Sequence, residues 1–471
     1  MNSRTRLACV RLLVALVAGS TAAAGVRTAN LVGSAYAATQ PLGPALGSDG
    51  GPTAYFLDEE ERSAFNLFSE LTHAMPNVSV RRNPVWNSWK TKCDVGLPDD
   101  CSGLAGLSLT HPDFFAMEYP TQTIHSYSHV PLDPISQDAY FAAYARAPQL
   151  ASVLFNPSAV ESIRRHHLES RSTLDRIIED LDNSSYAGSD RHLPNGTFEE
   201  GSIAVKLFWE LLPSNGKQPL RVFDDSILQT ADPTTLTLPP VSSWQNTYKV
   251  NFKDSIPCPD PLPTFGQSIP ISCLYSNHIK RTDAKAIRQL TKDGRDVVLG
   301  DPSCIKSSDV YAILVGIHIM RLTRERPQWE WMTFYLTNQD NQRGWKNPWR
   351  YFNLMSTDTL RSEAFPEHRY AYSPYLEAIV DGTHANCLNC HRLAAYSPQD
   401  NAGRATAAAA LAATDPDPAT RQTQEQAYFG EAVQTGFIWS LSTSQNQAER
   451  EAHKQFASQL EAYFERVDKL Q

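Results

Sequence analysis

The sequence is short of basic residues, and it has neither a long charged run nor a long apolar run after its first 37 residues. The 471 residues include 42 Lys+Arg against 51 Asp+Glu, a formal net charge of −9. This balance argues against a nucleic-acid-binding protein, which needs a basic stripe or patch. Thirty-one prolines argue against a coiled coil. An aromatic content of 10% is enough to fill a core and argues against intrinsic disorder.

Several common functional motifs are also missing. The sequence contains no serine-hydrolase elbow, no P-loop and no dinucleotide-binding glycine pattern. No internal repeat is visible. The stretch Val310–Met320 is uncharged but has only 11 residues, and a membrane-spanning helix needs about 20. The length predicts two or three domains at roughly 150 residues each.

The first 37 residues have the layout of a secretory signal peptide. Arg4 and Arg6 form a basic start, the 15 residues of Leu12–Val26 carry no charge, and Ala35-Tyr36-Ala37 is a small-x-small cleavage site. A retained membrane anchor is the alternative, but the apolar stretch is short for it. Cleavage would remove four arginines and no acidic residue, which leaves a net charge of 38 − 51 = −13. We therefore expect a periplasmic or secreted protein without a membrane span.

One motif is specific. Cys387-Leu388-Asn389-Cys390-His391 reads C-x-x-C-H, the attachment sequence of c-type haem. Two thiols at this spacing reach the two vinyl groups of one haem, and the next residue brings an imidazole under the iron. The motif occurs once, so we predict one covalent haem c with His391 as proximal ligand. Export is consistent with this prediction, because bacteria attach haem covalently outside the cytoplasm.

Two other chemistries use a C-x-x-C pair. A thioredoxin-like redox pair belongs in a βαβ pattern, and no such pattern flanks Cys387. Half of a zinc site is the second alternative. It would need remote partners, and the only H-x-x-x-H pair is His125 with His129. Both alternatives rank below haem attachment.

Five further cysteines remain after signal removal: Cys93, Cys101, Cys258, Cys273 and Cys304. In an oxidising compartment we expect disulfides. Cys93 with Cys101 and Cys258 with Cys273 would close short loops and are the natural local pairs. Because five is odd, one thiol stays free or the pairing is non-local.

Hydrophobic patterning predicts an α+β fold with an antiparallel sheet core, flanking helices and the haem attached near the C-terminal part. Helical spacing marks Glu59–Ala74 and Ser158–Leu181, and β-branched or aromatic runs mark the strands Ser202–Leu211, Val310–Leu322 and Trp329–Leu336. Arg221–Gly300 reads as loops over short strands. The expected organisation is a signal peptide (1–37), a flexible segment (38–57), a mainly helical region (58–200), a β-rich haem-binding region (201–400) and a C-terminal helical region (401–471).

The sixth position of the iron decides what such a haem does. No methionine follows His391, since the last is Met355, which disfavours the usual small cytochrome c arrangement. His318 is the leading distal candidate, because a buried imidazole in an apolar strand needs a partner; a core histidine bonded to backbone is the alternative. Met320 shares its strand face and is otherwise core filler. His453 is a further candidate, whereas His384 lies only three residues before Cys387, which is too close to reach the far face of the haem. His166 and His167 stand beside Arg164 and Arg165 within a helix and are better interpreted as a solvated basic face. An empty sixth position is also open.

The order of Gly201–Lys206, then Trp329-Glu330-Trp331, then the C-x-x-C-H motif is similar to the cytochrome P460 and β-sheet cytochrome c′ families. The resemblance implies an exported antiparallel-sheet haem c protein. In the P460 members a lysine on an early strand is cross-linked to the haem, and a five-coordinate iron oxidises hydroxylamine or binds nitric oxide. By position Lys206 matches that lysine. A solvent-facing lysine on an edge strand is the alternative interpretation.

These observations predict a monohaem cytochrome c that transfers electrons, with an acidic surface that steers a basic redox partner protein. The alternative is a haem-dependent oxidoreductase or gas binder with an open sixth position, P460-like in oxidising a small nitrogen compound. A binding or structural protein in which the motif is a coincidence is the third hypothesis.

Overall fold

The structure is a computed structural model in which all described residues belong to one compact unit, Leu57–Gln471. The described residues are 59–73, 84–96, 149–183, 191–194, 196–214, 219–224, 244–253, 255–279, 309–323, 329–340, 344–358, 374–375, 391, 394–397, 429–430 and 432–435.

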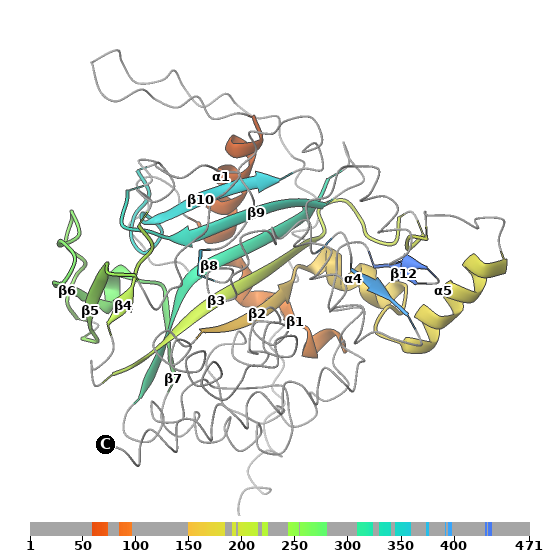
Figure 1. The fold of residues 1–471 in the computed structure, drawn as a ribbon, viewed down its shortest axis with the longest axis horizontal. Coiled ribbons are helices and arrows are strands. Elements are labelled where there is room, and N and C mark those ends of the chain that lie inside the picture. The colour runs from red at the N-terminus through yellow and green to blue at the C-terminus, as the bar shows by residue number, and fades with distance from the viewer. Residues whose placement is uncertain are drawn as a thin grey trace, which may run out of the picture. The chain divides into compact units, whose positions relative to one another are not determined.

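A seven-stranded sheet forms the centre of this unit (Figure 1). Its strands run in the order β1-β2-β3-β8-β9-β10, with β7 paired to β8, and every pairing is antiparallel. The bounds are β1 Lys90–Thr91, β2 Gln149–Phe155, β3 Ile203–Pro213, β7 Ser276–Ile279, β8 Val310–Leu322, β9 Trp329–Leu336 and β10 Phe352–Asp358.

The longest strands are the ones that the composition predicts. β8 and β9 begin and end at the expected residues, and β3 covers the expected Ser202–Leu211 to within two residues. β8 is rich in Val, Ile and Leu, whose side chains fit a pleated surface packed on both sides. Its residues Val310–Met320 are buried throughout.

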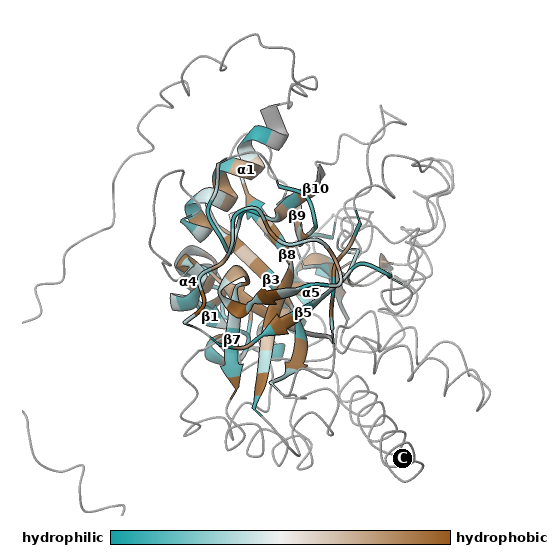
Figure 2. Ribbon diagram, turned by 90° about the vertical axis from the view of Figure 1, so that its left-hand side faces the viewer, coloured by the Kyte–Doolittle hydropathy of each residue, from teal (hydrophilic) through white to brown (hydrophobic). Residues whose placement is uncertain are grey.

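One face of the sheet packs against α1 (Glu59–Thr72), the helix expected from Glu59 to Ala74. Phe68 is fully buried there. Its ring stacks on Phe334 of β9 at 4.1 Å and on Trp345 at 5.0 Å between centroids. Figure 2 shows the middle strands coloured largely hydrophobic and the outer side of α1 partly hydrophilic. This aromatic cluster fixes α1 to the sheet.

The opposite face carries His318, and we call it the His318 face. One end of it is covered by α4 (Pro157–Arg165), α5 (Arg171–Asn183) and the two-stranded sheet of β11 (Ala395–Tyr396) and β12 (Val433–Gln434). Ile163, Leu174 and Tyr396 from these elements are fully buried in one cluster with Met320 and Trp331 of the main sheet.

The prediction of one continuous helix over Ser158–Leu181 is wrong, because α4 ends at Arg165 and α5 begins at Arg171. His166 and His167 lie in the turn between them, and His167 has a positive φ of 50°. The turn lets Leu168 insert fully into the core, with its amide donating to Ile163. Tertiary packing of Leu168 therefore breaks a helix that local periodicity alone would continue.

The other end of the His318 face is covered by a small three-stranded sheet. Its strands are β4 Leu220–Arg221, β5 Thr247–Asn251 and β6 Ser268–Pro270; β4 and β5 pair antiparallel, β5 and β6 parallel. The ring of Phe223, just after β4, packs edge-on against Tyr335 of β9 at 5.5 Å. Short strands among loops are what the composition of Arg221–Gly300 predicts.

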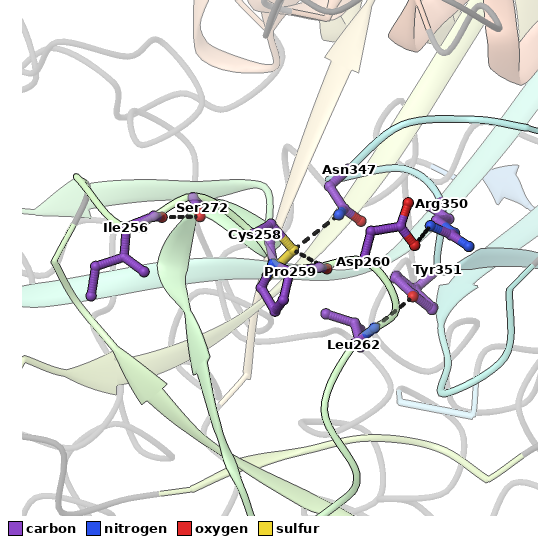
Figure 3. The surroundings of a disulfide bond; sticks show 10 residues. Ile256, Cys258, Pro259, Asp260, Leu262, Ser272, Asn347, Arg350 and Tyr351 are labelled. Atoms are coloured by element: carbon purple, nitrogen blue, oxygen red, sulfur yellow. Dashed lines mark hydrogen bonds and ion pairs between the residues drawn. A yellow bond between two sulfur atoms is a disulfide. The ribbon is translucent and has the colours of Figure 1, made fainter.

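A disulfide joins Cys258 and Cys273, as the sequence predicts (Figure 3). The Asn347 side-chain amide donates to Cys258 Sγ at 2.9 Å. Nearby, the Arg350 guanidinium binds Asp260 and Asp340, and these ion pairs hold its pKa above the ordinary value. The linked loop is thereby tied to the segment that leads into β10. The other predicted pair, Cys93 with Cys101, is not tested, because Cys101 lies outside the described residues, as does Cys304.

The described residues thus form antiparallel sheet with three α-helices, which is compatible with an α+β or a mostly-β fold. β2 and β10 are strands that the sequence patterns did not reveal, and β2 lies within the region expected to be mainly helical. None of the helices in the described ranges is long and apolar enough to cross a membrane. Residues 1–58, with the predicted signal peptide, lie outside the described residues, as does most of 401–471.

Replacing Phe68 with Ala should destabilise the protein by about 3–5 kcal/mol, because it leaves a cavity between α1, Phe334 and Trp345. The measurement is urea unfolding followed by tryptophan fluorescence. Asn66→Ala on the exposed side of α1 is the control, and it should stay within about 0.5 kcal/mol of the wild type. A Phe68→Ala loss within that margin would contradict the described packing of α1.

Candidate functional site

A row of polar side chains crosses the middle of the His318 face. The strand register pairs Lys206 of β3 with His318 of β8, and His318 with Thr333 of β9. Directly paired residues of antiparallel strands point to the same side of a sheet. Lys206, His318 and Thr333 therefore lie side by side on a sheet that is otherwise apolar at this level.

His318 is buried, with 3% of its surface exposed. Its imidazole packs edge-on against the ring of Phe208 at 4.7 Å between centroids. Burial, and then the positive charges of Lys206 and His391, lower the pKa of His318 well below its usual value of 6.5. The imidazole is therefore neutral near pH 7, and the neutral form is the one that binds metals.

The structure brings His391 to this same face. Its ring lies 4.2 Å from the ring of Trp331 between centroids, at an interplanar angle of 48°. Trp331 points to the same side as His318, because its partner Met320 is two residues beyond His318 on β8. The charge of His391 is close enough to act on His318. Two histidines 73 residues apart in the sequence (391 − 318) thus lie near each other.

Met320 is buried at 6% exposure and packs in the cluster that includes Trp331 and Ala204. As the sequence predicts, it shares the strand face of His318. Its surroundings are apolar on the side of α4 and α5, which favours the interpretation as core filler over that as an iron ligand.

Lys206 lies on an interior strand, since β3 is paired with β2 on one side and with β8 on the other. The interpretation of Lys206 as an edge-strand lysine is therefore wrong. The side chain is partly exposed, and its Nζ lies 5.5 Å from the centroid of the Phe208 ring. This is within the range of a cation–π contact, and it places the ammonium group beside the two rings of Phe208 and His318.

The chemistry of the donors on this face fits a haem. Trp331 Nε1 and Thr333 Oγ1 are buried and have no hydrogen-bond partner among the described residues. Buried polar atoms in proteins nearly always have a partner, so such atoms require an explanation. An aromatic ring against His391, a neutral imidazole at His318 and two buried donors form a set that could hold a porphyrin and its iron. The fit concerns only side chains that the structure describes.

Glu210 is a further polar group that sequence reasoning missed. It lies four residues beyond Lys206 on β3, and so on the same strand face, and it is fully buried. Neither carboxyl oxygen has a partner in hydrogen-bond geometry among the described residues. Burial raises the pKa of Glu210 to about 8, against the opposing influence of Arg221. The sequence does contain a sign of this arrangement: Lys206 and Glu210 are four residues apart in the otherwise apolar strand β3, so both side chains lie on the same face of the sheet.

Other predicted site residues fall elsewhere. His166 and His167 are exposed in the turn after α4, as expected for the solvated basic face predicted there. Cys387, Cys390, His384, His453, His125 and His129 lie outside the described residues. Within the described ranges no group of three or more His, Cys, Asp or Glu side chains is arranged to hold a metal ion.

Comparison with known proteins finds no match: no family model, no curated protein and no solved structure is significantly similar to this chain.

Replacing Glu210 with Gln should change how stability depends on pH. The unfolded carboxyl ionises near pH 4.5, whereas the folded one keeps its proton up to about pH 8. The folded state therefore binds more protons in this interval, and wild-type stability should fall as pH rises through it. Glu210→Gln lacks this decrease, so its free energy of unfolding, measured in urea at several pH values, should rise relative to wild type between pH 5 and 8. Parallel curves for the two proteins would contradict the buried, neutral carboxyl.

Proposed function

We propose that this protein is an exported c-type cytochrome that carries one covalent haem on the His318 face and transfers electrons. Cys387 and Cys390 would hold the haem by thioether bonds, and His391 would be the proximal ligand of the iron. The observation that supports this most is the position of His391 against Trp331, near a second, buried and neutral imidazole at His318.

The side chains around the two histidines have distinct roles in this proposal. Trp331 packs on the His391 ring and restricts its rotation. Phe208 packs edge-on against His318 and keeps water from it. Burial holds the His318 imidazole in the neutral form, which is the form that binds metals. When bound, the haem supplies the one-electron chemistry of its iron, and two imidazoles would favour electron exchange over binding of an added molecule.

One observation favours a second candidate, a P460-like haem oxidoreductase or gas binder. Lys206 lies directly opposite His318 on the neighbouring strand, and its ammonium group is close to the Phe208 ring. The resemblance to the P460 family implies a lysine cross-linked to the haem, and Lys206 would take that role. In this case His318 stays unligated and serves as a distal group. The long interval between Lys206 and the haem motif includes β4 to β6, which cover one end of the face, and β7, which pairs with β8 in the main sheet.

The charge of the mature chain suggests its partner. After removal of residues 1–37 the net charge would be −13 (38 − 51). An acidic protein of this kind attracts basic proteins over several ångströms at low salt and accelerates their encounter. We infer a basic redox partner protein in the periplasm or outside the cell.

The visible spectrum tests the two candidates against each other. For two-histidine ligation we expect sharp low-spin α and β bands in the reduced wild type, produced together with haem maturation factors. His318→Ala should convert this spectrum to a broad high-spin one that shifts on addition of carbon monoxide. Met320→Ala, two residues away on the same strand face, is the matched control and should keep the low-spin bands. A high-spin wild type that binds carbon monoxide would instead favour the P460-like candidate.

Haem attachment itself is tested by replacing both thiols of the motif. Cys387→Ser with Cys390→Ser should abolish the haem that remains bound in a denaturing gel, because only thioether bonds survive denaturation. Cys258→Ser with Cys273→Ser is the control with equal loss of thiols, and it should retain haem in the exported protein. Haem-free wild type, or haem that survives the loss of both motif cysteines, would contradict attachment at this motif.

A further inference from the structure

Glu210 is not used by the proposed electron-transfer site, although it lies on the same strand face. Lys206, Phe208 and Glu210 alternate along β3, and Phe208 contacts both the ammonium group of Lys206 and the ring of His318. Glu210 is the next residue in this line. It is fully buried, and both of its carboxyl oxygens are without a partner in hydrogen-bond geometry among the described residues.

The neighbours of Glu210 leave its charge largely uncompensated. The paired residues on adjacent strands are Ile313 of β8 and Gln149 of β2, and Ser276 of β7 follows beyond Ile313; none of them is charged. Among the described residues, Arg221 of β4 acts on Glu210 through its charge and through its backbone amide, and together these favour the ionised form less than burial opposes it. The guanidinium is directed elsewhere, with its Nη1 donating to the Trp244 carbonyl at 2.7 Å.

The geometry of β3 sets the distance between Glu210 and the row of Lys206, His318 and Thr333. Four residues of a β-strand span roughly 14 Å, so Glu210 lies about 15 Å from a metal bound by His318. A unit change of charge at that distance, at an effective dielectric constant of about 20, changes a proton affinity about sixfold. The interaction between the charge on the metal and the Glu210 carboxyl is therefore strong enough to measure. It is too weak to keep the Glu210 proton bound at every pH.

We propose that Glu210 is a redox-linked proton site whose proton affinity rises when one electron enters the haem, so that on average a fraction of a proton is taken up from solvent. The iron gains the electron from a reduced partner protein, and in that fraction of the molecules the Glu210 carboxylate becomes a carboxylic acid, which partly balances the added negative charge. The proposal rests on the proposed haem site. The raised pKa of the carboxyl places its ionisation close to neutral pH, where this exchange can take place.

The experiment is a spectroelectrochemical titration of the haem-loaded protein between pH 6 and 10. The midpoint potential of the wild type should fall by about 45 mV across this range, which is the sixfold change in affinity converted at 59 mV per tenfold. Glu210→Gln should remove this decrease. Glu161→Gln, an exposed carboxylate on α4, is the matched control and should keep it.

Infrared difference spectra between reduced and oxidised wild type provide a second measurement that needs no variant. We expect the carbonyl band of a buried carboxylic acid to gain intensity on reduction at pH 8 and to shift in D₂O. A wild-type potential that is independent of pH, or a decrease that persists in Glu210→Gln, would overturn the proposal while leaving the cytochrome intact. A purified protein without haem bands would refute the proposed function and this inference with it, so the two failures are distinguishable.

Discussion

The antiparallel pairing of β3, β8 and β9 is the constraint on which the candidate site depends. β3 and β8 are paired from Ile203–Arg321 to Pro213–Val310, and β8 and β9 from Gly316–Tyr335 to Leu322–Trp329. A shift of one residue in either register would move His318 or Lys206 to the face that packs against α1. Apolar residues occupy both faces of these strands, so the register decides which of the two buried faces receives the polar side chains.

The same pairing concentrates polar groups where polar groups are costly. A buried polar atom without a hydrogen bond costs about 1–3 kcal/mol, and Trp331, Thr333 and Glu210 all have such atoms among the described residues. The Trp331 ring belongs to the apolar cluster on the His318 face, so packing explains the position of its ring, but its Nε1 atom has no partner among the described residues. A bound group with its own polar edges, such as the haem proposed above, would provide interactions for these atoms.

Local sequence patterns predict several elements of this fold, but they do not predict how these elements pack together. The extents of β8 and β9 follow from their β-branched and aromatic composition, and the Cys258–Cys273 disulfide follows from loop length. The break between α4 and α5 does not follow from local pattern, because it depends on the packing of Leu168 in the core.

The candidate site also has a part that the sequence predicts and a part that depends on the fold. The C-x-x-C-H motif and the buried His318 are visible in the sequence. The placing of His391 against Trp331, and of Lys206 on an interior strand beside His318, depends on strand order. The pairing of β3 with β8 joins residues from 97 (310 − 213) to 118 (321 − 203) positions apart, and no short window of sequence contains it. For Glu210, the spacing from Lys206 in an apolar strand indicates that both residues share one face, but its complete burial depends on the assembled fold.

The central claim is that one haem is covalently bound to Cys387 and Cys390. Peptide mass mapping of the exported protein tests it most directly. We expect a single peptide spanning Cys387–His391 to carry the mass of one haem, and every other cysteine-containing peptide to lack it. A motif peptide of unmodified mass in protein produced with the haem maturation factors would contradict the account.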